Sequence, residues 1–355
     1  MNAPTREVDA GPAPTFETQD DLDAINSLYR ERRWSDGLPI VPPTVQRIER
    51  MLQHTQWRRD EVVARVAPGY GAATVERIAI NAVMAGCDPQ YLPVLIAATE
   101  AVADVEFNLQ GIQATTNPVA VWLILNGPLV TALNINEAFN CIGQGRWSNV
   151  TLGRAMRLIL QNIGGALPGE MDRATQGQPG KIAFCCAENA EASPWEPLHV
   201  ERGFPEEQST VTVVGAEGTM NMNTHSKDAM ELVRVIAETM MHPPSNEYVH
   251  GGEPWLIIGP EHAEVFKRGG LNKADVKRHL WAQSKMSVSR LSTKEVGRVR
   301  DSRTEELGEL TGETLLPISP RPEDIQLIVA GGPGTHSVYV PCFGNSRAVT
   351  RAITP

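Results

Sequence analysis

The sequence predicts an α/β protein with a largely helical N-terminal half followed by an α/β sheet region. Before residue 181 most apolar residues recur at helical spacing, and after it short β-branched runs alternate with helical segments. Hydrophobic residues make up 41% of the 355 residues and charged residues 21%, as in ordinary globular proteins. We therefore expect a flexible tail over 1–20, a mainly helical region with one or two strands over 21–180, and an α/β region over 181–355.

Each helix expected in the first half has one apolar face. They cover residues 20–33, 44–52, 73–87, 90–104 and 149–165. Gly86 suits the position just after a helix end, and Asp88 and Pro89 suit the start of the next helix. Between the last two helices, "AVWLILNG" (120–127) is a short apolar run bounded by turn residues, which predicts a buried strand.

The second half alternates strands and helices, the pattern of a sheet with helices on its faces. The expected strands are "IAFCCA" (182–187), "STVTVVGA" (209–216), "PWLIIG" (254–259) and "IQLIVAGG" (325–332). Two helices are expected over 226–241 and 260–270. Residues 328–344 read as strand, glycine turn and strand. No internal repeat of fixed period is visible in the sequence.

Charge and composition exclude several classes of protein. The net charge is −10 and there is no basic run, which argues against a nucleic acid partner. The most apolar stretch, from Pro118, is cut at residues 126–128, so no membrane span is expected, and nothing marks the N-terminus for secretion. We expect a cytoplasmic, oligomeric protein. The five cysteines are scattered and odd in number, which argues against a disulfide framework.

The densest chemistry lies in "KIAFCCAENAEASPWEPLHVERGF" (181–204). In a strand over 182–187, Cys185 and Cys186 face opposite sides, and Glu188, Asn189 and Glu191 follow at the strand's carboxyl end. Ligands usually bind at such ends in α/β sheets. The alternative is a core cysteine followed by a solvated acidic loop.

Roles follow from the chemistry of this segment. His199, beside Glu196 and Glu201, is the candidate acid/base, and Cys185 is a candidate nucleophile if its thiol pKa is lowered. Glu188 and Glu191 are the candidate orienting or proton-carrying carboxylates. Two further residues complete the segment, Trp195 as a substrate contact and Arg202 as an anion clamp.

Two other segments carry candidate binding residues. In 219–228, Thr224 or Ser226 is expected to cap the following helix, with Asp228 in its first turn, so the loop faces a positive helix pole. In 331–337 the glycines can form an anion-binding nest. The candidate substrate-binding residues are Asn221, Asn223, His225, Gly332, Gly334 and His336. Ordinary capping and an ordinary glycine hairpin are the alternatives, and no dinucleotide or phosphate-loop motif is present.

No metal ligands are assigned, and the sequence leaves the cofactor unknown. HExxH and a Cys/His quartet are both absent, and the eight histidines are dispersed. A mixed site of Glu188, Glu191, His199 and His225 is chemically allowed, but sequence separation gives it no geometric support.

Five motifs together resemble a large bacterial family of hypothetical proteins associated with small proteins that carry selenocysteine-Gly-Ser-Cys or Cys-Gly-Ser-Cys. The motifs are "WSDGLPIVPPT", "TVERIAINAVMAGC", "NIGGALPGEMD", "PGKIAFCCAENAEASPWEPLHVERGF" and "VAGGPGTHSVYVPCFG". The matching positions after the strand are Cys185, Glu188, Asn189, Glu191, Trp195, Glu196, His199 and Arg202. Ala190 departs from the glutamate that the family pattern has there. The resemblance implies a small thiol or selenol protein as partner.

The sequence thus favours an enzyme or enzyme subunit, a lyase or hydrolase, that cleaves a carbon–heteroatom bond of a small molecule by acid/base or thiol-assisted chemistry. Two alternatives stay open. One is a metal-dependent hydrolase or lyase. The other is a non-catalytic partner subunit of a thiol or selenol protein, with Trp195 and Arg202 at its interface.

Overall fold

The computed structural model describes residues 11–243 and 245–354, and the first ten residues of the expected tail lie outside this range. Two four-stranded sheets form the middle of the molecule. The first has the order β12 (Val349–Ala352), β5 (Thr210–Ala216), β3 (Ala120–Asn126) and β4 (Cys185–Ala187). The second has the order β6 (Met220–Asn223), β11 (His336–Val340), β7 (Trp255–Ile258) and β10 (Gln326–Val329).

The two sheets face each other across an apolar layer because side chains alternate along each strand. In β3, Trp122 and Ile124 join residues of the second sheet, such as Trp255, in one core cluster. Leu123 and Leu125 point the other way and join a cluster with the N-terminal helices. Every residue of β3 is buried, which explains its uninterrupted apolar sequence.

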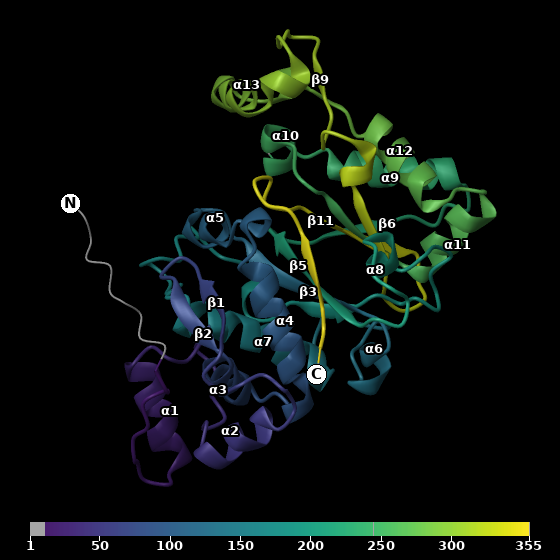
Figure 1. Ribbon diagram of the computed structural model, residues 1–355. Coiled ribbons are helices and arrows are strands. Elements are labelled where there is room, and N and C mark those ends of the chain that lie inside the picture. Colours follow the sequence, from purple (N-terminus) through teal and green to yellow (C-terminus); the bar gives the residue numbers. More distant parts are fainter. Residues whose placement is uncertain (1–10, 244, 355) are drawn as a thin grey trace.

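Helices cover both outer faces, giving four layers (Figure 1). Helices α1 (Leu22–Glu31), α2 (Val45–Leu52), α3 (Val75–Ala85), α4 (Leu92–Val102) and α7 (Trp147–Asn162) lie on the first side. Helices α9 (Ala229–Met240), α11 (Pro260–Arg268) and α12 (Lys273–Gln283) lie on the second. As predicted, Gly86 ends α3 in the left-handed conformation, with φ of 90°. No helix within the described ranges is long and apolar enough to cross a membrane.

The remaining elements are short or peripheral. They are β1 (Val62–Val66), β2 (Gly71–Thr74), α5 (Leu109–Ala114), α6 (Leu129–Ala132), α8 (Leu198–Glu201), α10 (Asn246–His250), β8 (Met286–Ser287), α13 (Thr293–Leu307) and β9 (Leu315–Leu316), with five 3₁₀ turns among the described residues. The antiparallel pair β1–β2 is absent from the sequence-based expectation.

Both sheets have the same internal pattern. In each, a parallel pair (β3 with β4, β7 with β10) is followed by two antiparallel neighbours. The outermost strands are exchanged, because β5 leads into β6 of the second sheet and β11 leads into β12 of the first. The two connections cross at an antiparallel bridge between Ala216 and Cys342.

Two features differ from the sequence-based expectation. The boundary at residue 181 is not a structural one, because β3 pairs with β4 and β5 from the second half. The chain is mixed α/β throughout. Residues 328–344 are strand, glycine turn and strand as expected, but β10 and β11 do not pair as the alternative hairpin, because β7 lies between them. A parallel partner distant in sequence is invisible to a local pattern.

Candidate active site

A cavity of about 480 Å³ opens at the carboxyl ends of the parallel strands β3 and β4. Asn126 is the last residue of β3, and Glu188 follows β4 directly. The lining residues are Asn126, Gly127, Pro128, Val130, Thr131, Glu137, Glu188, Asn189, Ala190, Glu191, Pro197, His199, Glu206 and Glu207. We call this cavity the acidic pocket. Its position at the strand ends is the one that ligand sites favour in α/β sheets.

Glu188 is held rigidly in the acidic pocket, with 4% of its surface exposed. One carboxyl oxygen, Oε2, accepts hydrogen bonds from Asn126 Nδ2 at 2.6 Å and from the Leu198 amide at 2.7 Å. The other, Oε1, has no partner among the described residues. Burial raises the pKa of the Glu188 carboxyl, and the nearby Lys273 charge and these two hydrogen bonds offset only part of that rise. The carboxyl therefore holds its proton to a higher pH than an exposed glutamate.

His199 lies in α8 and is 2% exposed. Its Nε2 is 3.2 Å from the carbonyl oxygen of Glu206. Because a carbonyl oxygen only accepts, this contact places a proton on Nε2. Within the described chain, Nδ1 and also Asn126 Oδ1 have no hydrogen-bond partner. Three residues of one pocket thus each keep a buried polar atom unpaired, a rare arrangement in a folded protein.

The charge of the acidic pocket is one-sided. Five glutamates line it, Glu137, Glu188, Glu191, Glu206 and Glu207, and the lining contains no lysine or arginine. Glu191 is exposed at the rim. Such a lining favours a molecule that is positively charged or rich in hydrogen-bond donors.

An ion cluster with two buried lysines supports α8. Glu201 accepts from Lys273 Nζ at 2.6 Å and also pairs with Lys277. Lys273 Nζ reaches the Glu196 carbonyl oxygen as well, at 3.4 Å. The sequence placed Glu201 beside His199 as a carboxylate partner, but the structure turns it toward the two lysines. The cluster fixes the helix that carries His199 and so acts on its position.

Cys185 lies apart from the acidic pocket. Its side chain faces the first helical layer, opposite to Cys186, as the strand alternation predicted. It lines a separate cavity of about 420 Å³ with Asn149 and Ile182. Burial raises the pKa of the Cys185 thiol, so the thiol stays protonated at neutral pH. That environment disfavours a nucleophilic thiolate.

Trp195 and Arg202 also lie outside the acidic pocket. Trp195 packs on Phe266, with ring centroids 6.0 Å apart, and its Nε1 donates to the Leu271 carbonyl at 3.4 Å. Arg202 Nη1 donates to the Ala348 carbonyl at 3.0 Å, and its guanidinium lies over the ring of Trp255. Arg202 thus joins parts of the two sheets, and its location does not match an anion clamp in this pocket.

The two glycine- and asparagine-rich segments meet each other, and none of their residues lines the acidic pocket. His225 Nδ1 lies 3.0 Å from Thr335 Oγ1, and His336 Nδ1 lies 3.1 Å from Asn221 Oδ1. Asn223 pairs with His336 in the ladder of β6 and β11. The side chain that caps α9 is that of Asp228, which accepts from two amides, so the expected cap at Thr224 or Ser226 is wrong.

The glycine loop contacts the wall of the acidic pocket through backbone hydrogen bonds but does not line it. The Gly331 amide donates to the Glu137 carbonyl at 2.8 Å, and the Asn189 amide donates to the Val329 carbonyl at 2.7 Å. A Cβ at Gly332 would lie 2.1 Å from the ring of Phe139, an exposed side chain that a larger residue here would displace. Gly334 has φ of 151°. The shared hollow expected for all three segments therefore does not form.

The structure adds residues that the sequence did not single out. Asn126, Glu137, Glu206 and Glu207 line the acidic pocket. The sequence could have indicated Asn126, because this polar residue ends an apolar strand, and Glu188 directly follows another one.

Within the described part of the chain, no group of three or more His, Cys, Asp or Glu side chains stands close enough to hold a metal ion. Comparisons with protein-family models, curated proteins and solved structures give no match.

Proposed function

We propose that this protein is an enzyme, or the catalytic subunit of one, that cleaves a carbon–heteroatom bond of a small molecule in the acidic pocket. One observation carries the proposal: a carboxyl and an imidazole, both buried, each keep an unpaired atom in one cavity. Pairs of titratable groups in unlike environments are the usual basis of acid and base roles.

The two groups divide the proton transfers between them. His199 Nδ1 takes a proton from a substrate carbon. The electron pair of that C–H bond forms a double bond to the adjacent carbon, and the bond from the adjacent carbon to the heteroatom breaks. The raised pKa of Glu188 keeps a proton available for the departing heteroatom. In a hydrolase the same base would take the proton of water instead. Asn126 Oδ1 is left to accept a hydrogen bond from the substrate.

The lining suggests the substrate class. A small amine or ammonium compound matches a lining that has four other glutamates beside Glu188 and no lysine or arginine. Thiol assistance from Cys185 is not supported, because its thiol is protonated and lines another cavity.

A second candidate function, a subunit that binds a small thiol or selenol protein, is favoured by one surface feature. Val150 and Ile182 line the cavity beside Cys185 and are exposed, as is Trp147 one helical turn before Val150. Exposed apolar side chains around a cavity are typical of protein contacts. Ile182→Lys should abolish binding of a Cys-Gly-Ser-Cys peptide in calorimetry. Equal binding by the two proteins, or none by wild type, would remove this candidate.

The enzyme proposal is tested by turnover. The purified protein is incubated with a panel of small amines that carry hydroxyl, amino or thioether leaving groups, with and without added thiol, and products are followed by mass spectrometry. We expect His199→Gln to lower the rate by roughly 10²- to 10⁴-fold, and Glu264→Gln, on exposed α11 surface, to leave it unchanged. If His199→Gln turns over at the wild-type rate, the proposed base is wrong.

A further inference from the structure

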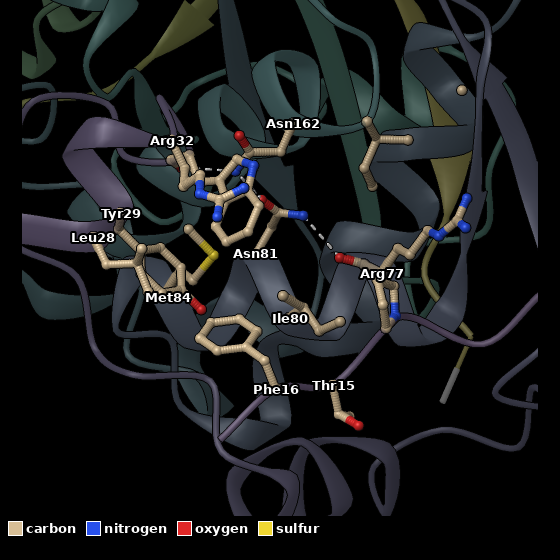
Figure 2. Close-up of a pocket in the computed structure, with 14 residues that line it drawn as sticks. Thr15, Phe16, Leu28, Tyr29, Arg32, Arg77, Ile80, Asn81, Met84 and Asn162 are labelled. Carbon is tan, nitrogen blue, oxygen red and sulfur yellow. Dashed lines mark hydrogen bonds between the residues drawn. The ribbon is translucent and has the colours of Figure 1, made fainter. Parts of the chain in front are cut away.

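A second cavity, of about 630 Å³, lies between the segment 14–16, α1, α3 and the end of α7 (Figure 2). Its lining residues are Pro14, Thr15, Phe16, Leu28, Tyr29, Arg32, Trp34, Gly71, Arg77, Ile80, Asn81, Met84, Asn162 and Ile163. None of them lines the acidic pocket. We call this cavity the aromatic pocket.

Three rings form much of its wall. Tyr29 meets Trp34 edge to face with centroids 5.4 Å apart, and Phe16 lies 6.2 Å from Trp34. Figure 2 shows Phe16 near Ile80 and Met84, which provide an aliphatic wall. Phe16 is 51% exposed and Trp34 38% exposed, so both large side chains remain open to a ligand.

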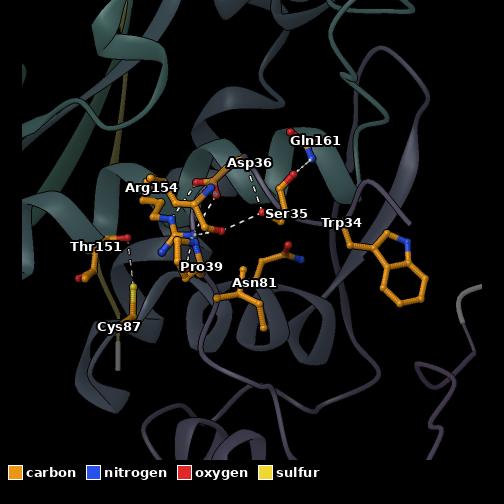
Figure 3. Close-up of polar contacts among 12 residues, drawn as sticks. Trp34, Ser35, Asp36, Pro39, Asn81, Cys87, Thr151, Arg154 and Gln161 are labelled. Atoms are coloured by element: carbon orange, nitrogen blue, oxygen red, sulfur yellow. Dashed lines mark hydrogen bonds and ion pairs between the residues drawn. The ribbon is translucent and has the colours of Figure 1, made fainter. Parts of the chain in front are cut away.

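The Trp34 wall is preformed by hydrogen bonds to α7. Asn162 Nδ2 donates to the Trp34 carbonyl at 2.9 Å, and Gln161 Nε2 donates to the carbonyls on either side of that residue. Two residues later, Asp36 accepts two hydrogen bonds from Arg154 at 2.7 and 2.9 Å (Figure 3). A wall fixed in this way costs a ligand little ordering entropy.

The polar groups of the aromatic pocket suit an anion. The described lining holds two guanidinium groups and no carboxylate, although the chain as a whole has a net charge of −10. The Arg32 guanidinium lies 5.9 Å from the Trp34 ring centre and has no ion-pair partner in the described ranges. Tyr29 is 7% exposed, yet among described residues nothing bonds to its hydroxyl. Burial raises the pKa of Tyr29, which keeps that hydroxyl a donor.

We propose that the aromatic pocket binds a planar organic anion, an aromatic carboxylate. Its ring would lie among Phe16, Tyr29 and Trp34, and its carboxylate would accept from Arg32 and from the Tyr29 hydroxyl. Stacking and a charge-assisted hydrogen bond together distinguish this ligand from a neutral aromatic molecule and from an amine.

Three probes with one ring system test the proposal by calorimetry: 2-naphthoate, 2-naphthalenemethanol and 2-naphthylmethylammonium. We expect wild type to bind the carboxylate on the order of tenfold more tightly than the alcohol, and the ammonium least. Arg32→Gln should abolish the preference for the carboxylate, and Phe16→Ala should weaken all three. Arg32 and Phe16 are exposed, so both variants should fold, which circular dichroism checks.

Controls separate this site from other binding. Arg234→Gln removes an exposed arginine on α9 and should change no affinity. Glu188→Gln should leave naphthoate binding intact, so the two pockets are tested independently. The proposal is overturned if folded wild type binds none of the probes, binds them equally, or binds naphthoate as well after Arg32→Gln.

Discussion

Trp122 and Trp255 meet edge to face between the two sheets, with ring centroids 5.7 Å apart. Trp122 pairs with Val214 and Trp255 pairs with Val340. Val214 and Val340 each lie two positions before a residue of the bridge at which the connections cross, Ala216 and Cys342 respectively. The two tryptophans therefore occupy equivalent positions in two copies of one strand pattern. The strands are equivalent in topology, which a search for a fixed sequence period does not detect.

Glu188 should separate chemistry from stability. Glu188→Gln keeps an oxygen that accepts from Asn126 and Leu198 but cannot carry the acidic proton, so we expect turnover to fall by roughly 10²- to 10⁴-fold at unchanged stability. Glu188→Ala leaves both donors unpaired and should also cost about 1–3 kcal/mol of unfolding free energy. Urea denaturation with initial rates measures both effects. Normal turnover by a folded Glu188→Gln protein would exclude Glu188 as the acid.

Glu217 should make stability depend on pH. Burial, and then the neighbouring Glu247, raise the pKa of Glu217 from 4.5 to about 8. Because the folded chain binds this proton more tightly, the stability it contributes is full below pH 4.5 and is lost as the pH rises through about 8. Glu217→Gln should match wild type at pH 4 and exceed it at pH 9 by more than about 1 kcal/mol, with the difference growing between pH 4.5 and about 8. A difference in unfolding free energy between variant and wild type that is the same at the low and the high pH, measured by urea denaturation, would contradict this.

The Asp36–Arg154 pair should be a strong determinant of stability. Both side chains are largely buried, at 5% and 11% exposure, and they share two hydrogen bonds. Asp36→Asn leaves a buried guanidinium uncompensated and should cost about 3 kcal/mol or more. Asp60→Asn breaks the exposed pair with Arg58 and serves as the matched control, with no expected shift of the urea midpoint. Equal midpoints for the two variants would argue against the role of Asp36.

Two helical glycines should respond oppositely to alanine. A Cβ at Gly153 would lie 2.5 Å from the Phe184 nitrogen, so Gly153→Ala pushes α7 away from the chain before β4 and should cost about 1–3 kcal/mol. At Gly297 in α13 nothing lies within 4 Å, and alanine should add about 0.5–1 kcal/mol. Thermal unfolding of both variants provides the check. If alanine destabilises the protein at both positions, the expected gain in helix propensity at Gly297 is wrong.

The five cysteines should be inert in the folded protein. All are free and buried, and burial raises the pKa of the Cys185 thiol. Iodoacetamide at pH 7.5 should label none of them before denaturant is added and all five afterwards, as peptide mass spectrometry would show. Rapid labelling of Cys185 in the native state would restore it as a nucleophile.

Local patterns in the sequence predict the elements well where burial follows one period. The helices near 75–85, 92–102 and 147–162 and the strand at 120–126 lie where periodicity places them. The opposite faces of Cys185 and Cys186 also follow from strand alternation alone. By contrast, β1 and β2 are short and partly polar, so neither has a clear period.

Non-local contacts account for what the sequence does not reveal. Asn126 and Glu188 are 62 positions apart, and only the parallel pairing of β3 with β4 brings them together. Glu201 is two residues from His199, yet it turns to lysines more than 70 positions away. Proximity along the chain was therefore a poor guide to the neighbours of the candidate base, whereas strand ends were a good one.

The exchange of outer strands has a consequence for biosynthesis. Residues 349–352 complete the sheet whose adjacent strand, 210–216, emerges from the ribosome well over a hundred residues earlier. The nascent N-terminal half therefore carries an uncovered strand edge throughout that interval. Chaperone binding to stalled chains that end before residue 349 should be stronger than to chains that extend past it.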